Sequence, residues 1–591
     1  MADNYPFDLG THQRQVSTDS ADAQLWFNRG LIWANCYNHE EAARCFTVAA
    51  EYDPKCAMAH WGYAYATGPN YNKSWIRFDR ADLETSIKLS NEALGRALAL
   101  RESSSPVERA LIEALVARFP ATDNIPEQIE HMREYDGRYV DAMRPVYQAF
   151  RNDMDVVGLF VEALICVSPR GLWDLDTGKP VGDGTVEARN VIEPALETAD
   201  GRAHPALPHL YIHLMEMSPF PEIALPAADR LRHVVPDGSH MSHMATHIDA
   251  ACGRWDRVIE SNGVASVADN LYFSTKHGSV LYTIYRAHNV LTKAYGGIMA
   301  GRSEVAIEAA KRLYEIITPA TLSITSPPLA DWIESQLGTI AHALVRFGRW
   351  DEILELEIPT YQKLFVSTTA MIRYSKGIAL AVLGRIEEAE IAQIEFEKAR
   401  AAVPFSRLNS LPSRDQDVLK VGSAMLKGEL EYRKKNFEPA FEHLREAVRL
   451  EDALPYCDPP PWLQPSRHAL GALLLDQGHI EEAEQVYRDD LGLGEGLPRR
   501  RARINNVFGL HGLYECLTRA GKHQEAKLLK IPRDIAIASA DIPIEASCFC
   551  RRTALSGSSS SHGINPDNLV ESGSSIVTGL TCCSGKTGGT K

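Results

Sequence analysis

Residues 23–56 read AQLWFNRGLIWANCYNHEEAARCFTVAAEYDPKC and contain one complete unit of the pattern that decides the fold. Gly30 and Ala42 lie 12 positions apart, and small residues at such a spacing allow two antiparallel helices to cross closely. Larger apolar residues such as Phe46 fill the rest of the seam, and Pro54 ends the second helix because proline has no amide hydrogen. The stretch therefore predicts a helical hairpin.

The same Gly-to-Ala interval recurs along the chain, which indicates a repeat array. It is found at Gly377/Ala389, Gly428/Ala440 and Gly471/Ala483. Gly-Arg pairs mark the expected turn between helices at Gly253-Arg254, Gly348-Arg349 and Gly384-Arg385. These features resemble the tetratricopeptide repeat (TPR) family. The resemblance implies an all-α fold, an α-α superhelix in which antiparallel helix pairs stack into a TPR-like solenoid.

The chain divides into six segments. We expect an N-terminal extension at 1–19, N-terminal TPR-like repeats at 20–167, an irregular loop or insertion at 168–204, central histidine-rich repeats at 205–310, C-terminal repeats at 311–545, and a disordered Ser/Gly/Cys tail at 546–591. The tail lacks the apolar surface that offsets the entropy of ordering. The loop is long enough to cover part of the groove.

The composition excludes several classes of function. Apolar residues make up 45% of the chain, and its formal net charge is -15, whereas nucleic-acid binders normally carry a clustered basic face. The first residues have no basic stretch followed by an apolar run, and no segment approaches the length of a membrane span. We therefore expect a cytoplasmic protein that binds neither nucleic acid nor membranes.

Histidines follow the repeat period in the central segment. When repeats are framed from 205, 239 and 273, equivalent positions carry His209, His243 and His277 in one row, and His213 and His247 in another. Within HLYIHLME, the spacing i, i+4, i+7 places His209, His213 and Glu216 on one helix face. HMSHMATH, which begins with His240, has a similar spacing. In the TPR family, which this segment resembles, these positions line the concave ligand-binding groove.

Imidazoles gathered in this way predict a metal site. Neighbouring helices pack about 8–10 Å apart, so side chains from two of them can share an ion, and imidazole without cysteine leaves Cu, Fe and Zn open. The predicted ligands of one or two such divalent ions are His209, His213, Glu216, His243 and His247. Catalytic or substrate-orienting roles are expected for His240, His277, Tyr285 and His288.

Two classes of function fit such a groove. One is a metal-dependent enzyme acting on a small molecule, with an oxidoreductase or oxygenase favoured over a hydrolase. The alternative is a scaffold that binds a peptide without catalysis, although Phe27, Tyr374 and Met425 occupy the groove position where a clamp for carboxylates needs polar groups. Residues 20–530 also resemble a group of uncharacterised bacterial and fungal TPR proteins with HLYIHLMEMSP-like and HMSHMATHI-like segments, which implies no particular reaction.

Residues outside the histidine rows allow further expectations. Trp61 and Tyr65 form either an aromatic wall of the cavity or part of the core. Glu162 is a candidate for a carboxylate that orients a ligand from outside. Structural roles are expected for His204, His233 and His468.

Overall fold

Helices follow one another along the whole described chain. The computed structural model describes residues 5–275 and 280–551, and these contain 27 α-helices and no β-strand. Consecutive helices pack against each other as hairpins. The predicted all-α, TPR-like repeat fold is therefore confirmed.

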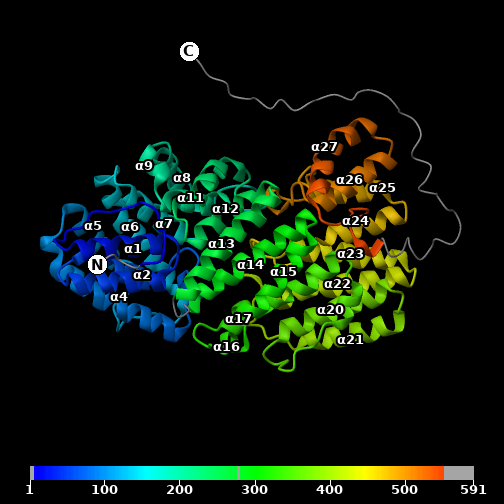
Figure 1. Cartoon of the computed structure of the whole chain (residues 1–591), viewed down its shortest axis with the longest axis horizontal. Coiled ribbons are helices and arrows are strands. Elements are labelled where there is room, and N and C mark those ends of the chain that lie inside the picture. Colours follow the sequence, from blue (N-terminus) through cyan, green and yellow to red (C-terminus); the bar gives the residue numbers. More distant parts are fainter. Residues whose placement is uncertain (1–4, 276–279, 552–591) are drawn as a thin grey trace, which may run out of the picture.

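The N-terminal helices are α1 (Ala21–Asn35), α2 (His39–Tyr52), α3 (Ala57–Thr67), α4 (Arg80–Leu100), α5 (Pro106–Val116), α6 (Arg133–Ala149), α7 (Met154–Cys166), α8 (Gly182–Leu196) and α9 (Ala199–Ala203). The central helices are α10 (Ala206–Met215), α11 (Leu225–Val234), α12 (Ser239–Ala251), α13 (Trp255–Thr275), α14 (Val280–Ala300) and α15 (Ser303–Ile316). The C-terminal helices are α16 (Pro319–Leu322), α17 (Leu329–Ile333), α18 (Thr339–Arg346), α19 (Trp350–Glu355), α20 (Val366–Val382), α21 (Ile386–Ala401), α22 (Asp415–Arg433), α23 (Phe437–Asp452), α24 (Ser466–Asp476), α25 (Ile480–Asp490), α26 (Val507–Arg519) and α27 (His523–Ser539). Figure 1 shows α1–α6 at one end of the molecule, α12–α15 in the middle and α20–α27 at the other end.

Close helix crossings explain the recurrent glycines. A Cβ atom at Gly30 would lie 2.8 Å from the ring of Phe46, and one at Gly428 would lie 2.7 Å from Leu444. Both contacts are too short for a side chain, so only glycine lets the two helices of each hairpin approach this closely. At Gly253, between α12 and α13, φ is +69°, the left-handed conformation that commonly ends a helix.

The segment 168–204 is only partly irregular, which corrects the sequence-based prediction. Helices α8 and α9 occupy most of it, and the irregular part ends at Val181. Ala188, Val191 and Ile192 are buried on one face of α8, so the helix is stabilised by packing. The prolines and glycines that indicate a loop include Pro169, Gly171, Gly178 and Pro180, which precede this helix, and Pro194, which lies in its last turn.

The third hairpin of the central segment starts later than the repeat frame predicts. Residue 273 lies inside α13, which runs to Thr275, and the next helix starts at Val280. Because α13 has 21 residues whereas α11 has 10, the 34-residue frame does not carry over to α14. His277 lies outside the described residues.

The predicted tail starts too early. Ser547, Cys548 and Cys550 are buried, and the two cysteines form a disulfide. Arg346 donates a hydrogen bond to the carbonyl of Ser547 at 2.9 Å, and the Ser547 hydroxyl donates to the carbonyl of His468 at 2.9 Å. Residues 546–551 thus belong to the folded body, and 552–591 lie outside the described residues.

We expect a chain that ends at Glu545 to be less stable than one that ends at Arg551. The shorter chain exposes apolar surface and leaves the buried Arg346 without its carbonyl acceptor, which together cost about 2–4 kcal/mol. Denaturant unfolding of the two truncated chains measures the difference directly. Equal unfolding midpoints would contradict the assignment of 546–551 to the fold.

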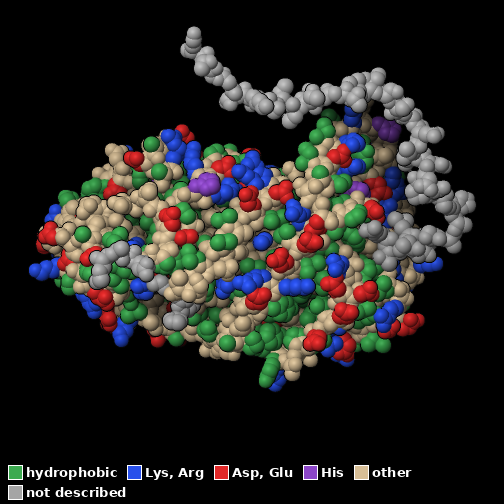
Figure 2. Space-filling model, in the orientation of Figure 1, with side chains coloured by type: hydrophobic (Ala, Val, Ile, Leu, Met, Phe, Trp, Pro, Cys, Tyr) green, Lys and Arg blue, Asp and Glu red, His purple; other side chains and the backbone are tan. Residues whose placement is uncertain are grey.

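Charged and hydrophobic side chains are mixed on the face drawn in Figure 2. Acidic and basic side chains are interspersed there, and few histidine atoms are visible. Among the described residues, no helix combines the length and apolar character needed to cross a bilayer.

Candidate metal centre

Two neighbouring helices carry most of the histidine rows. Helices α10 and α12 are the first helices of consecutive hairpins and pack against each other. Their four row histidines, His209, His213, His243 and His247, and the additional His240 are all buried. The rows therefore face the interior of the array.

Each helix brings two imidazoles together across one turn. Nε2 of His209 lies 3.2 Å from Nε2 of His213. Nε2 of His243 lies 3.0 Å from Nε2 of His247. Ring nitrogens therefore face each other across two narrow gaps.

Hydrogen bonds on the outer edges of the rings determine where the protons lie. Nδ1 of His209 faces the carbonyl of Asn35 at 2.9 Å, so it carries the proton that this acceptor needs. Nδ1 of His243 faces Oδ1 of Asn262 at 2.8 Å. The Asn262 amide donates to the carbonyl of Val258, which identifies the amide oxygen as the acceptor. In a neutral imidazole the other nitrogen is then unprotonated, so Nε2 of both histidines directs a lone pair into its gap.

Glu216 connects the two pairs. Its carboxylate accepts a hydrogen bond from Nδ1 of His213 at 3.1 Å and another from Nδ1 of His247. It is 3% exposed, so its charge is compensated by these two rings rather than by solvent. One carboxylate therefore orients one imidazole from each pair.

A third imidazole joins each pair. The ligand atoms of His209, His213 and His240 lie within 4.8 Å of one another, and so do those of His243, His247 and His288. We call these sets the first and the second triad. Both nitrogens of His240 are buried without a hydrogen-bond partner, and an orphaned buried polar group of this kind is expected where a ligand is missing.

Burial controls the protonation of the cluster. Burial, followed by repulsion from neighbouring imidazoles, holds the pKa of His209 and of His240 well below the ordinary range. Burial alone would raise the pKa of Glu216, but His247 holds it well below its usual value. Burial likewise opposes protonation of His247, yet Glu216 raises its pKa. Neutral imidazoles beside an ionised carboxylate are the forms that bind metal ions.

Another group of possible ligands contains two carboxylates and one histidine, and it is less suited to a cation. Glu216, His247 and Asp458 also place ligand atoms within 4.8 Å of one another. However, the guanidinium of Arg500 donates to Asp458 at 2.5 Å. A positive charge already compensates this carboxylate, which favours the two triads.

The structure brings nearly all the predicted site residues together. The two triads and Glu216 include His209, His213, Glu216, His240, His243, His247 and His288. Tyr285 contacts them through His240, with ring centroids 4.9 Å apart. His277 is the exception because it lies outside the described residues.

Tyr37 is a site residue that the histidine rows do not reveal. Its ring centroid lies 4.6 Å from that of His209 and 5.3 Å from that of His240. It follows the C-terminus of α1 with φ of 55°, a left-handed conformation that is uncommon outside glycine. No periodic signal marks such a position.

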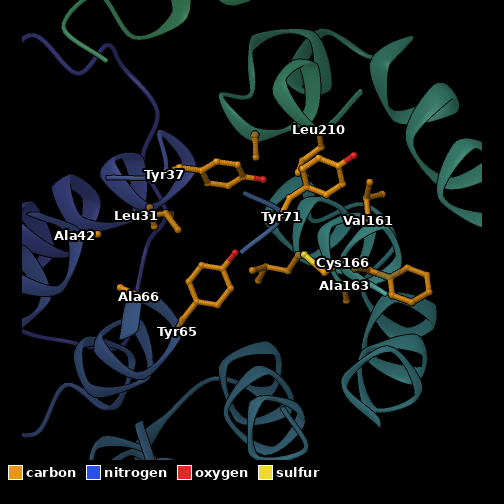
Figure 3. Packing of buried hydrophobic residues seen from close by; sticks show 14 of the residues in the cluster. Leu31, Tyr37, Ala42, Tyr65, Ala66, Tyr71, Val161, Ala163, Cys166 and Leu210 are labelled. Carbon is orange, nitrogen blue, oxygen red and sulfur yellow. The ribbon is translucent and has the colours of Figure 1, made fainter. Parts of the chain in front are cut away.

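Trp61 and Tyr65 belong to the core. Their rings stack with centroids 5.4 Å apart, and both are buried. The Tyr65 hydroxyl donates to Glu162, which lies beside Arg118 and has no hydrogen bond to a triad histidine among the described residues. Figure 3 shows Tyr65 extending toward the helix that carries Cys166.

The histidines expected to be structural lie outside both triads. Nε2 of His204 lies 3.0 Å from Oδ1 of Asp155. Nε2 of His468 lies 2.8 Å from Oδ2 of Asp490, and both of these residues are fully buried. His233 is exposed at the end of α11. His204 and His468 are therefore hydrogen-bonded to carboxylates outside the two triads, and His204 forms a separate group with His12 and Asp155 whose ligand atoms lie within 4.8 Å of one another.

A cavity of about 310 Å³ opens onto both triads. Its wall includes His240 from the first triad and His288 from the second. Tyr285 and Trp332 supply apolar surface, and Arg170 supplies a charged group. The volume is near the lower end of the range of small-molecule sites.

Comparison with known proteins adds little beyond the helical architecture. No protein-family model and no curated protein matches the chain. Among solved structures, it is similar to a human IFIT1 dimer with m7Gppp-AAAA (13% identity over 82% of this chain and 90% of that chain, TM-score 0.29). It is also similar to the APC/C hetero-tetramer Cut9-Hcn1 (12%, 90% and 95%, TM-score 0.25) and to the P58(IPK) TPR domain (13%, 73% and 98%, TM-score 0.16). Similarities this weak carry no argument about function.

Proposed function

We propose that this TPR-like solenoid holds divalent transition-metal ions in its two histidine triads. The main observation in support of this proposal is that the Nε2 atoms of His209 and His213 lie 3.2 Å apart. Their Nδ1 atoms face a carbonyl and a carboxylate, so two lone pairs point at each other. Without a cation between them this arrangement is repulsive, and a coordinated metal ion removes the repulsion.

The two triads suit two ions rather than one. Each offers imidazole nitrogens and no thiolate, a donor set that binds Cu, Fe and Zn. Three protein ligands leave coordination positions open, as in catalytic metal sites. Under this assignment Glu216 orients His213 and His247 through their Nδ1 atoms and does not itself coordinate an ion.

The proposed activity is metal-dependent chemistry on a small molecule in the adjoining cavity. A bound metal ion would supply Lewis acidity or electron transfer there. We favour redox chemistry over hydrolysis because two all-imidazole sites match copper or iron at least as well as zinc. His240 is buried and lines this cavity beside the half-buried Tyr285.

A peptide-binding scaffold is the second candidate. It is supported by the regular hairpins α20–α21, α22–α23 and α24–α25, which continue the array beyond the histidine cluster. In this alternative the central histidines serve only the stability of the array. The two candidates differ in whether the purified protein contains metal.

Metal analysis of full-length protein purified without immobilised nickel tests the proposal. We expect close to two equivalents of a transition metal per chain, and a visible absorption band if it is copper or iron. Chelation should lower the melting temperature, because an ion present at about 1,000 times its Kd adds about 4 kcal/mol to the stability of the folded state. Protein without metal that melts at the same temperature with or without Cu, Fe or Zn would favour the scaffold.

A further inference from the structure

Two arginines in the wall of the same cavity have no acidic partner. Arg77 and Arg170 both line it and are half-buried. Within the described chain, neither guanidinium forms an ion pair, and the side-chain hydrogen bond of Arg170 is a 3.4 Å contact with the neutral Asn72. Lys73, on the same wall, is paired with Asp82 at 2.6 Å. The two arginines therefore lack an ion-pair partner on a wall that also carries the carboxyl group of Glu40.

The two guanidinium groups also repel each other. Burial, with the like charge of Arg170 as the next cause, lowers the pKa of Arg77 to about 10. The chain has 77 acidic residues against 62 basic ones, so partners for cations are abundant elsewhere. Two cations that lack an acidic partner reduce the stability of the folded state unless a ligand supplies the negative charge.

The backbone holds Arg170 in place at some cost. Its φ is 59°, a left-handed conformation that glycine adopts more easily. Its amide donates to the hydroxyl of Tyr71 at 3.1 Å, and the Tyr71 ring lies 4.3 Å from that of His213 between centroids. Arg170 is thus attached to the wall of the first triad.

The cavity also reaches the second triad, because His243, His247 and His288 line it together with Arg170. Tyr285, Ile284 and Trp332 present apolar surface in the same cavity. The cavity thus has a cationic part, an apolar wall and the two triads.

We infer that Arg77 and Arg170 bind an oxyanion group, a carboxylate or a phosphate, of the substrate, and that the apolar wall holds its hydrocarbon or aromatic body near the triads. Guanidinium groups match the planar oxygen pairs of such anions. The part of this inference that places the hydrocarbon or aromatic body of the substrate near the triads rests on the proposed function. The anion site itself requires no metal.

Calorimetric titration of full-length protein with benzoate and with inorganic phosphate, before and after chelation, tests the inference. We expect at least one anion to bind in both states, and more weakly at high salt. Arg77→Gln combined with Arg170→Asn should weaken that binding about 10- to 100-fold, because Asn keeps the left-handed backbone but lacks the guanidinium. Binding of benzoate alone indicates a carboxylic acid, and binding of phosphate alone indicates a phosphate ester.

Matched variants separate this inference from the metal proposal. Metal content should be unchanged in Arg77→Gln, whose melting temperature should equal or exceed that of the wild type because one of two like charges is removed. Arg138→Gln, at an exposed Glu134 pair on α6, should bind the anion normally. His213→Ala combined with His247→Ala should bind it with the affinity of the chelated wild type. If neither anion binds, or if the arginine variants bind as tightly as the wild type, the inference is overturned.

Discussion

His213→Ala is expected to lose one of the two metal ions, and His247→Ala the other, with activity lost in both. Each substitution removes a nitrogen that faces its partner at 3.2 or 3.0 Å. Loss of a direct ligand should lower metal affinity by more than the roughly 10- to 100-fold seen for outer residues. Metal content per chain, measured alongside circular dichroism, checks this result. The double variant should contain no metal while remaining helical, because the apolar seams of the hairpins lie elsewhere.

His342→Gln is the matched control for these variants. His342 is a buried histidine of α18 that contacts Trp462, outside both triads. It should keep two ions per chain. His468 is less suitable, because its removal leaves the buried Asp490 without one of its hydrogen bonds. Two ions retained in both His213→Ala and His247→Ala would rule out the triads as ligands.

The helical repeat determines how much of the site the sequence can predict. His209 and His213 share a face because they are four residues apart, and His243 and His247 repeat this one unit later. Within α10 and α12 those two periods fully specify which side chains meet. The convergence of these four residues is therefore predictable without a structure.

Positions after a change in helix length are not predictable in this way. The longer α13 displaces the third hairpin, so Tyr285 and His288 occupy the places that the frame assigns to earlier residues. A periodic argument fails wherever one helix gains turns.

Site residues on turns and distant segments leave no periodic signal at all. Tyr37 follows α1, Arg170 precedes α8, and Asp458 lies after α23, yet all three line one cavity. Each position is set by tertiary packing of segments far apart in the chain. The same limitation applies to residues 546–551, whose composition resembles that of the sequence after them but whose side chains are buried.

Glu216→Gln is expected to weaken metal binding in both triads at once, by about 10- to 100-fold. The carboxylate accepts from Nδ1 of His213 and of His247, whereas a glutamine offers one oxygen and one NH₂ group. Its NH₂ group would face the N–H of one ring, and its neutral oxygen would accept from the other ring more weakly than a carboxylate does, so both rings lose part of what orients them. Metal titration of each site, with the metal's absorption spectrum, measures the loss.

Glu222→Gln provides the control on the neighbouring segment, because Glu222 is exposed and contacts only Arg499 at 3.4 Å among the described residues. It should leave both affinities unchanged. A direct-ligand role for Glu216 predicts a different pattern, in which one ion is lost entirely and the other keeps its affinity. Weakening of both ions therefore identifies an orienting carboxylate, since Glu216 hydrogen-bonds to one imidazole in each triad. Unchanged affinity at both sites would show that the two triads do not depend on Glu216.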